Sequence, residues 1–142
     1  MASGSGRSIH PHFELSARDA AKFGLLYLND GEYNGNRVVS PNWVHDSLLT
    51  YSEDAWTIRV DRNFNDTGYG YGYQWWSVRA GDHQYSLAWG HGGQQIVLLD
   101  EFDMVIVVTA DPFYQEHNDQ AWKHEKANLN LVADFIASLP SE

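Results

Sequence analysis

YSLAWGHGGQQIVLLDEFDMVIVVT, residues 85–109, contains three apolar runs separated by two short segments that are polar or rich in glycine. The runs are Tyr85–Trp89, Gln95–Leu99 and Met104–Thr109. Their length and their content of Val, Ile and Leu predict β-strands, and the continuous apolar character of the last two indicates burial on both faces. The connections at residues 90–93 and 100–103 are short, which favours antiparallel pairing.

The segment upstream of this stretch predicts a further strand. Residues 69–73 alternate strictly between Tyr and Gly, and Gln74-Trp75-Trp76-Ser-Val78 continues the run to a turn at Ala80–Asp82. Alternation places Tyr69, Tyr71, Tyr73 and Trp75 on one face of the strand. Such a face can stack on a sugar, but cross-strand aromatic pairs more often pack a sheet against a helical layer. We keep Tyr71, Tyr73 and Trp75 as candidate aromatics at the mouth of a site.

Helical patterns flank the predicted sheet on both sides. Ser16 and Ser40-Pro41 are typical helix starts, and Asn29-Asp-Gly31 is a typical helix end. Between about residues 119 and 138, Trp122, Leu129, Val132, Ile136 and Leu139 recur on one helical face, and Lys123, Glu125, Lys126 and Asp134 on the other. We therefore expect an α+β fold with an antiparallel sheet of three to four strands, two N-terminal helices and a closing amphipathic helix packed on the sheet.

Length and composition set the outer limits. The 142 residues predict a single domain over residues 13–142, after a flexible lead at 1–12 and with a long surface loop at 51–68. A net charge of −10 disfavours nucleic acid and anionic membrane surfaces as partners. The absence of Cys excludes disulfides and thiolate metal sites. No segment is apolar enough to span a membrane, and Met1–Arg7 has no signal-peptide pattern, so the compartment stays open.

Several of these segments, in this order, resemble the C-terminal half of the serine β-lactamase-related family. The matching segments are Leu15–Asn29, Tyr33–Trp43, Gly68–Trp76 and Gly90–Gly93 with the Gln95–Thr109 hairpin. This family, which is similar to the penicillin-binding proteins, includes class C β-lactamases, D-amino-acid peptidases and β-lactamase-fold esterases. The resemblance covers roughly residues 13–138. It implies a partial β-lactamase or transpeptidase-like fold.

The resemblance also implies one wall of an acyl-transfer site. In the family a Lys-Thr-Gly motif lies on an edge strand beside the active site, and His91, Gly92 and Gly93 occupy its three positions here. The backbone N–H of Gln94 would then be one donor to a developing oxyanion, which a strand holds without reorganisation. Glycines let a substrate approach the strand closely. His in the Lys position favours esterase or peptidase chemistry over β-lactam hydrolysis.

The nucleophile of the family is missing from this sequence. It would be the Ser of a Ser-x-x-Lys motif, but Lys22, Lys123 and Lys126 follow Asp19, Gln120 and Lys123 at that spacing. Tyr27-Leu-Asn29 has the form of the catalytic Tyr-x-Asn motif, yet Tyr27 lies in a helical pattern, where it is expected to pack. We therefore predict that the chain holds no complete catalytic set and is inactive alone. The alternative is a non-catalytic binding or assembly domain derived from the same fold.

Two other groups of residues could carry chemistry. A Ser–His–Asp triad could use Ser77 or Ser86 with His91 and Asp82 or Asp100, but nothing in the sequence fixes its geometry. A metal could bind His10, His12, His117 or His124, but their spacing matches no known site, and we predict no metal and no cofactor.

The expectation about partner chains comes from the last predicted strand. In the complete family fold, N-terminal strands pair with this strand, here Met104–Thr109. An exposed apolar edge of this kind invites pairing with another chain. We expect either a homo-oligomer or completion by a separate N-terminal chain through this edge, with a small-molecule or peptide substrate only in the completed form.

Overall fold

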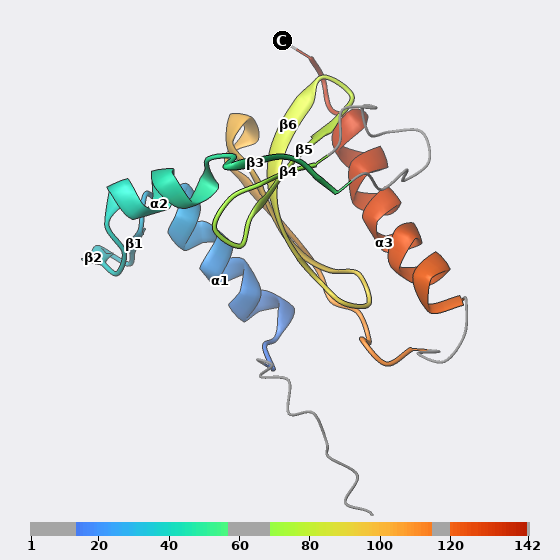
Figure 1. Cartoon of the computed structure of the whole chain (residues 1–142). Coiled ribbons are helices and arrows are strands. Elements are labelled where there is room, and N and C mark those ends of the chain that lie inside the picture. The colour runs from blue at the N-terminus through green and yellow to red at the C-terminus, as the bar shows by residue number, and fades with distance from the viewer. Residues whose placement is uncertain (1–13, 57–68, 115–119, 142) are drawn as a thin grey trace, which may run out of the picture.

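The computed structural model describes residues 14–56, 69–114 and 120–141, and side chains within these ranges except those of residues 54–56. A six-stranded antiparallel sheet forms its centre, with helix α3 on one face and helix α1 on the other (Figure 1). The strands, in spatial as well as chain order, are β3 (Ser52–Trp56), β4 (Tyr69–Tyr71), β5 (Trp76–Ala80), β6 (His83–Gly90), β7 (Gln94–Leu99) and β8 (Met104–Val108). The helices are α1 (Ala17–Leu28), α2 (Pro41–Leu48) and α3 (Gln120–Ala137), with a short 3₁₀ helix η1 (Asp100–Phe102) between β7 and β8. A separate small hairpin, β1 (Glu32–Tyr33) and β2 (Asn36–Arg37), joins α1 to α2.

The predicted α+β class, the antiparallel pairing and the two N-terminal helices are confirmed. Both helix starts form as expected, because the hydroxyl oxygen of Ser16 accepts from the backbone N–H of Asp19 and that of Ser40 accepts from Trp43. The strands predicted within residues 85–109 agree with β6, β7 and β8 to within two residues at each end. The predicted lead at residues 1–12 lies outside the described residues.

The prediction of three to four strands was wrong, because the sheet has six. One extra strand, β3, lies in the segment predicted as a loop, and residues 57–68 of that segment lie outside the described residues. The other arises because the expected single strand from Tyr69 to Val78 reverses between β4 and β5. The backbone N–H of Gly72 donates to the carbonyl of Trp75 at 2.8 Å, and Gln74 adopts a φ of 69°. A period-two pattern continues unchanged through such a tight turn, so it does not reveal the reversal.

The main core lies between the sheet and α3. Leu87, Val97 and Leu99 of the central strands are fully buried against Leu129 and Ile136 of the helix, as the closing-helix prediction required. Each such side chain contributes about 1.5–3 kcal/mol through its burial. The prediction put Trp122 on the apolar face of this helix and Glu125 on the polar face. Both placements were wrong, because Trp122 is 39% exposed and Glu125 is only 6% exposed.

The second layer is α1, which lies against β7 and β8. Gly24 permits this close approach, since a Cβ atom built there would lie 2.5 Å from Cγ1 of Val105. Trp75 is buried on this side, with its ring centroid 4.9 Å from Tyr27 and 6.4 Å from Phe23. The alternating aromatics therefore divide between the two faces, since Tyr69 lies in the core under α3. Among the described residues, no helix has the length and apolar character needed to cross a membrane.

Candidate functional site

The Gly90–Gly93 segment forms the turn between β6 and β7, which are central strands of the sheet. The resemblance placed this motif on an edge strand, and that placement was wrong for this chain, because β5 and β8 continue the sheet on either side. The backbone N–H of Gly93 donates to the carbonyl of Gly90 at 3.1 Å, and φ is 87° at Gly92 and 90° at Gly93. Residues other than glycine rarely adopt such φ angles, which explains why both positions are glycine.

Glu125 of α3 holds this turn from beneath. Its Oε2 atom accepts from the backbone N–H of Gly92 at 2.9 Å, and its Oε1 atom accepts from the indole N–H of Trp89 at 2.9 Å. The carboxylate is nearly buried, so these two donors replace the water that it has lost. Nδ1 of His91 lies 3.7 Å from the same Oε2 atom.

Sequence reasoning missed Glu125 because it assigned the residue to the polar face of the closing helix. The spacing contained the information, since Glu125, Leu129, Val132 and Ile136 follow the i, i+4, i+7, i+11 pattern of one face. A charged residue on the same helical face as buried apolar residues indicates a hydrogen-bonding or ionic partner in the protein interior.

A second polar group from α3 and β7 completes the support of the turn. The side-chain amide of Gln95, itself 3% exposed, donates to the carbonyl of Asn128 at 3.0 Å and to that of Gly93 at 3.4 Å. The amide of Asn128 donates in turn to the carbonyl of Gly92 at 3.4 Å. A Cβ atom on Gly93 would lie 2.9 Å from the Asn128 amide nitrogen, so the helix and the turn are in direct contact. The backbone of the turn is therefore fixed by the protein before any ligand arrives.

The predicted site residues His91, Gly92, Gly93 and Gln94 lie together, but with different exposure. The side chain of His91 is 69% exposed, whereas Gly92 and Gly93 are buried and Gln94 is half-buried at the start of β7. A surface groove of about 330 Å³ on the α1 side is lined by Gly90 and Gln94, together with Leu15, Gln74, Thr109 and further residues of β6–β8. The turn thus offers an exposed imidazole and the edge of a groove on a rigid backbone.

The candidate aromatics do not line this groove. Tyr71 packs on Trp76 with ring centroids 4.4 Å apart, and Tyr73 stacks on Tyr51 at 4.7 Å. Trp75 is buried under α1, as described above. None of Tyr71, Tyr73 and Trp75 is among the described residues that line the groove, and their role at a site mouth stays a prediction.

The residues considered for a Ser–His–Asp triad, a catalytic Tyr or a metal site make other contacts. Ser77 and Ser86 face each other across β5 and β6, and the Ser77 hydroxyl accepts from the side chain of Gln84 at 2.9 Å. Asp82 accepts from the hydroxyl of Ser141, and Tyr27 packs on Phe23 and Trp75. Within residues 14–56, 69–114 and 120–141, no three His, Asp or Glu side chains gather to hold a metal ion. His10, His12 and His117 lie outside these ranges.

His83 is a second buried titratable residue that the sequence analysis did not single out. One ring nitrogen contacts the carboxylate of Glu101, and the other lies 3.2 Å from the carbonyl of Leu139. Both nitrogens are thus engaged within the protein, and the contact ties the segment after α3 to β6. We assign it a structural role.

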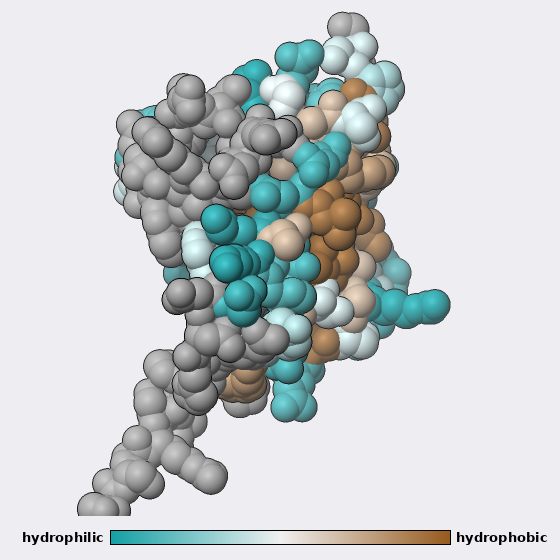
Figure 2. Space-filling model, turned by 90° about the vertical axis from the view of Figure 1, so that its right-hand side faces the viewer, coloured by the Kyte–Doolittle hydropathy of each residue, from teal (hydrophilic) through white to brown (hydrophobic). Residues whose placement is uncertain are grey.

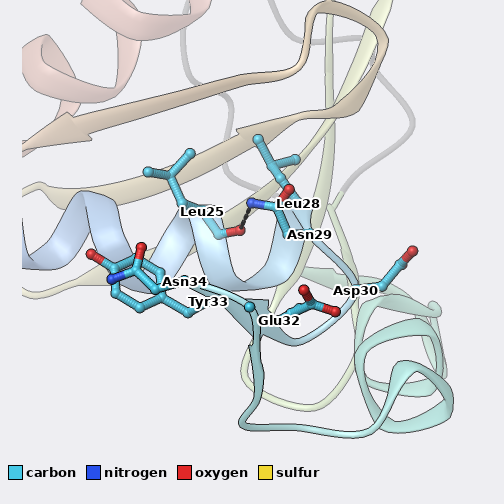
Figure 3. Close-up of a pocket in the computed structure, with 8 residues that line it drawn as sticks. Leu25, Leu28, Asn29, Asp30, Glu32, Tyr33 and Asn34 are labelled. Atoms are coloured by element: carbon cyan, nitrogen blue, oxygen red, sulfur yellow. Dashed lines mark hydrogen bonds between the residues drawn. The ribbon is translucent and has the colours of Figure 1, made fainter.

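A larger hollow, of about 580 Å³, lies between the end of α1 and the β1–β2 hairpin (Figure 3). Its walls include Asp30, Glu32 and Asn34, and the side chain of Asn29 donates to the carbonyl of Leu25 at 2.8 Å. Polar groups here bind one another, since Arg37 donates to the carbonyl of Asp30 and forms an exposed ion pair with Glu32. We do not assign it a ligand.

No protein-family model and no curated protein matches this sequence. Chains of solved structures do match, and one is a Bacillus anthracis protein described as a 6-aminohexanoate-dimer hydrolase, with a TM-score of 0.54 and 23% sequence identity. The likeness covers 88% of this chain but only 30% of that one. It shows that this chain has a fold similar to a part of a hydrolase of the β-lactamase fold, in agreement with the predicted partial fold.

Proposed function

We propose that this chain is the C-terminal part of a β-lactamase-related serine hydrolase and supplies one wall of its acyl-transfer site. The observation that carries this proposal is the Gly90–Gly93 turn, fixed by Glu125 and bordering a groove, in a fold similar to a part of a hydrolase. The reaction class is transfer of an acyl group from an ester, an amide or a lactam to a serine hydroxyl.

The chemistry assigned to the wall is stabilisation of charge rather than nucleophilic attack. A carbonyl under attack develops a negative oxygen, and preorganised backbone N–H donors stabilise it because they need not reorient. The N–H of Gly92 donates to Glu125. The donor that the resemblance assigns to the substrate is the N–H of Gln94, which lies opposite Gly90 at the start of β7. To the exposed imidazole of His91 we assign a hydrogen bond with either the substrate or a catalytic hydroxyl from the rest of the site.

The nucleophile must come from another segment, because the 142 residues contain no Ser-x-x-Lys. Without a nucleophile, charge stabilisation and binding alone leave only weak residual assistance. The chain alone is therefore expected to give no turnover of nitrocefin or of p-nitrophenyl esters above the rate in buffer. Turnover that survives both His91→Ala and treatment with active-site serine probes would contradict the assigned site.

A binding experiment tests the wall directly. A phosphonate monoester carries a tetrahedral anion that resembles the oxyanion intermediate, and its titration is followed by ¹H–¹⁵N NMR of the chain. We expect the largest shift at the Gln94 amide, with smaller shifts at His91 and Gly93. Gly35→Ala, in the open β1–β2 turn, is a control outside the site, although its positive φ introduces local strain. If the amides of residues 90–94 do not respond while others do, the proposed wall is wrong.

The second candidate, a non-catalytic assembly domain on the same fold, is favoured by a different observation. That observation is the apolar outer edge of β8, which has no strand neighbour among the described residues.

A further inference from the structure

The side chains of His91 and Glu125 meet at the turn between β6 and β7. Figure 1 shows this turn beside the first half of α3, and a Cβ atom on Gly93 would lie 3.2 Å from Cα of Glu125. Nδ1 of His91 lies 3.7 Å from Oε2 of Glu125. The imidazole is otherwise open to solvent, because the side chain of His91 is 69% exposed. One ring nitrogen of His91 therefore faces a carboxylate oxygen of the protein itself.

The carboxylate of Glu125 is shielded from water and bound by donors. Its Oε1 atom accepts from the indole N–H of Trp89 and its Oε2 atom from the backbone N–H of Gly92. An ionised carboxylate only accepts hydrogen bonds, which matches these two donors. Figure 2, which looks at the molecule from the α3 side, shows hydrophilic residues on that face, where water hydrates them. Glu125 is nearly buried instead, so its charge acts on neighbouring groups with less screening than a surface charge.

The position of this charge bears on which ring nitrogen of His91 carries the proton. A neutral imidazole has one N–H donor and one acceptor nitrogen, and its surroundings select between the two forms. With the proton on Nδ1, the N–H dipole points its positive end at Oε2 of Glu125. With the proton on Nε2, the lone pair of Nδ1 faces a negative charge and is repelled. At 3.7 Å the two atoms are beyond hydrogen-bond distance, so the preference for Nδ1–H is electrostatic.

We propose that Glu125 is a positioning residue for His91, which it holds as the Nδ1–H tautomer so that Nε2 is left as a hydrogen-bond acceptor. This role rests on the proposed function, because it concerns the partner of His91 in the acyl-transfer site. The two nitrogens of an imidazole ring point in divergent directions, so Nε2 is directed away from the carboxylate. An acceptor nitrogen binds an O–H group and repels a carbonyl oxygen or a carboxylate. The partner of His91 is therefore a hydroxyl group and not the carbonyl oxygen of the substrate.

The opposite tautomer would give His91 the opposite role. An imidazole in water, with no charged neighbour, carries its proton mainly on Nε2, and such a side chain offers a donor to a substrate oxygen. If Glu125 only supported the backbone of the turn, His91 would show this ordinary preference. The tautomer of His91 thus separates a positioning role of Glu125 from a purely structural one.

Long-range ¹H–¹⁵N NMR of the imidazole rings measures the ratio of the two tautomers, because protonated and unprotonated ring nitrogens resonate at very different frequencies. The spectrum is recorded on the whole chain at about pH 9, where an ordinary imidazole is neutral. The chain has seven His residues, so His91→Gln identifies the signals of His91 by their loss. The reference is N-acetylhistidine methylamide in the same buffer. In the wild type we expect the ratio of Nδ1–H to Nε2–H to exceed that of the reference by roughly threefold or more, as a largely exposed charge contact allows.

Two variants test whether the charge of Glu125 is the cause. Glu125→Gln keeps the size of the side chain and removes the charge, so the ratio at His91 should return to that of the reference. Trp89→Phe is the matched control, because it removes one donor from the same carboxylate and leaves the charge beside His91. We expect this control to keep the wild-type ratio. Amide spectra of both variants report whether the fold is intact.

A raised ratio in the wild type and in Trp89→Phe that is lost in Glu125→Gln supports the proposal. A wild-type ratio equal to that of the reference overturns it, and this comparison is decisive even where Glu125→Gln does not fold. Equal loss in both variants also overturns it, because the order of the turn and not the charge would then set the tautomer. The result is separate from the test of the proposed function, in which the Gln94 amide responds to the phosphonate, because the tautomer is measured without a ligand.

Discussion

Glu125→Gln is the most informative single change, because Gln keeps the size of the side chain and alters only its hydrogen bonding. The carboxylate accepts from two donors, the indole N–H of Trp89 and the backbone N–H of Gly92. A Gln side chain can accept only through its oxygen, and its NH₂ group then points at the second donor. One of the two donors therefore loses its partner in a nearly buried place.

The expected loss of stability follows from that count. A buried donor left without a partner costs about 1–3 kcal/mol, and the neutral side chain offsets part of this because it is easier to desolvate than a carboxylate. We expect the free energy of unfolding to fall by about 1–2 kcal/mol for Glu125→Gln. For Glu125→Ala, which removes both acceptors and leaves a cavity, we expect about 3–5 kcal/mol. At about 4 °C per kcal/mol for a chain of this length, the Gln variant should melt about 4–8 °C lower.

The assay combines thermal unfolding with NMR of the indole N–H of Trp89. Asp134→Asn is the matched control, because it removes a carboxylate from an exposed position of the same helix. We expect the control to melt within about 2 °C of the wild type, as surface substitutions usually do. The indole resonance and the amide of Gly92 should shift in Glu125→Gln alone. Equal melting temperatures for the two variants, with an unmoved Trp89 resonance, would refute the role given to Glu125.

Three further outcomes are expected. Gly24→Ala should lower the free energy of unfolding in denaturant by about 1–3 kcal/mol, because the new Cβ atom would lie 2.5 Å from a methyl of Val105. The energetic cost of this overlap exceeds the gain in helix propensity from Gly to Ala. A stabilised variant would show that α1 is not packed as described. Gly92→Ala should disturb the amide resonances of the turn and lower the free energy of unfolding by about 1–3 kcal/mol, because φ is 87° at this position and a Cβ atom would lie 2.7 Å from the backbone of Pro112. Unchanged spectra and an unchanged free energy of unfolding would contradict this geometry. Burial raises the pKa of Tyr69 and Tyr85 above the unfolded value of about 10, so both ionise first in the unfolded state. Their contribution to the free energy of unfolding is therefore fully present below about pH 10 and is lost as the pH rises further. Tyrosinate absorbance should show both ionising only with unfolding, and complete ionisation of the native protein would contradict their burial.

The parts of the fold that the sequence predicted well are those where one physical signal acts alone. Continuous apolar runs gave β7 and β8, and a capping Ser gave the start of α1 at Ala17. The prediction failed where two elements share one pattern. The turn between β4 and β5 is set by a tertiary contact, because the N–H of Tyr73 donates to the carbonyl of Ser47 in α2. Local periodicity contains no information about that partner.

The candidate site shows the same division. Its glycines were singled out through the resemblance to the β-lactamase-related family, which gave Gly92 and Gly93 the positions of a motif beside the active site. Its support was missed because Glu125 is separated from Gly92 by 33 positions along the chain. Charge alone suggested a solvated face, and only the alignment of Glu125 with Leu129 along the helix indicated burial. Periodicity is thus the better guide to burial, and a charge that violates it is a signal of function or of a specific support.

The burial of Glu125 also bears on what the turn is for. A nearly buried carboxylate loses water, and an apolar side chain at the same position would avoid that loss while packing as well. The strands β6 and β7 need no carboxylate to join them, since the N–H of Gly93 and the carbonyl of Gly90 already close the turn. What a carboxylate does and an apolar side chain cannot do is hold two N–H donors, on Trp89 and Gly92, at a fixed spacing. The carboxylate therefore fixes the position of the turn backbone, which the proposed acyl-transfer wall requires.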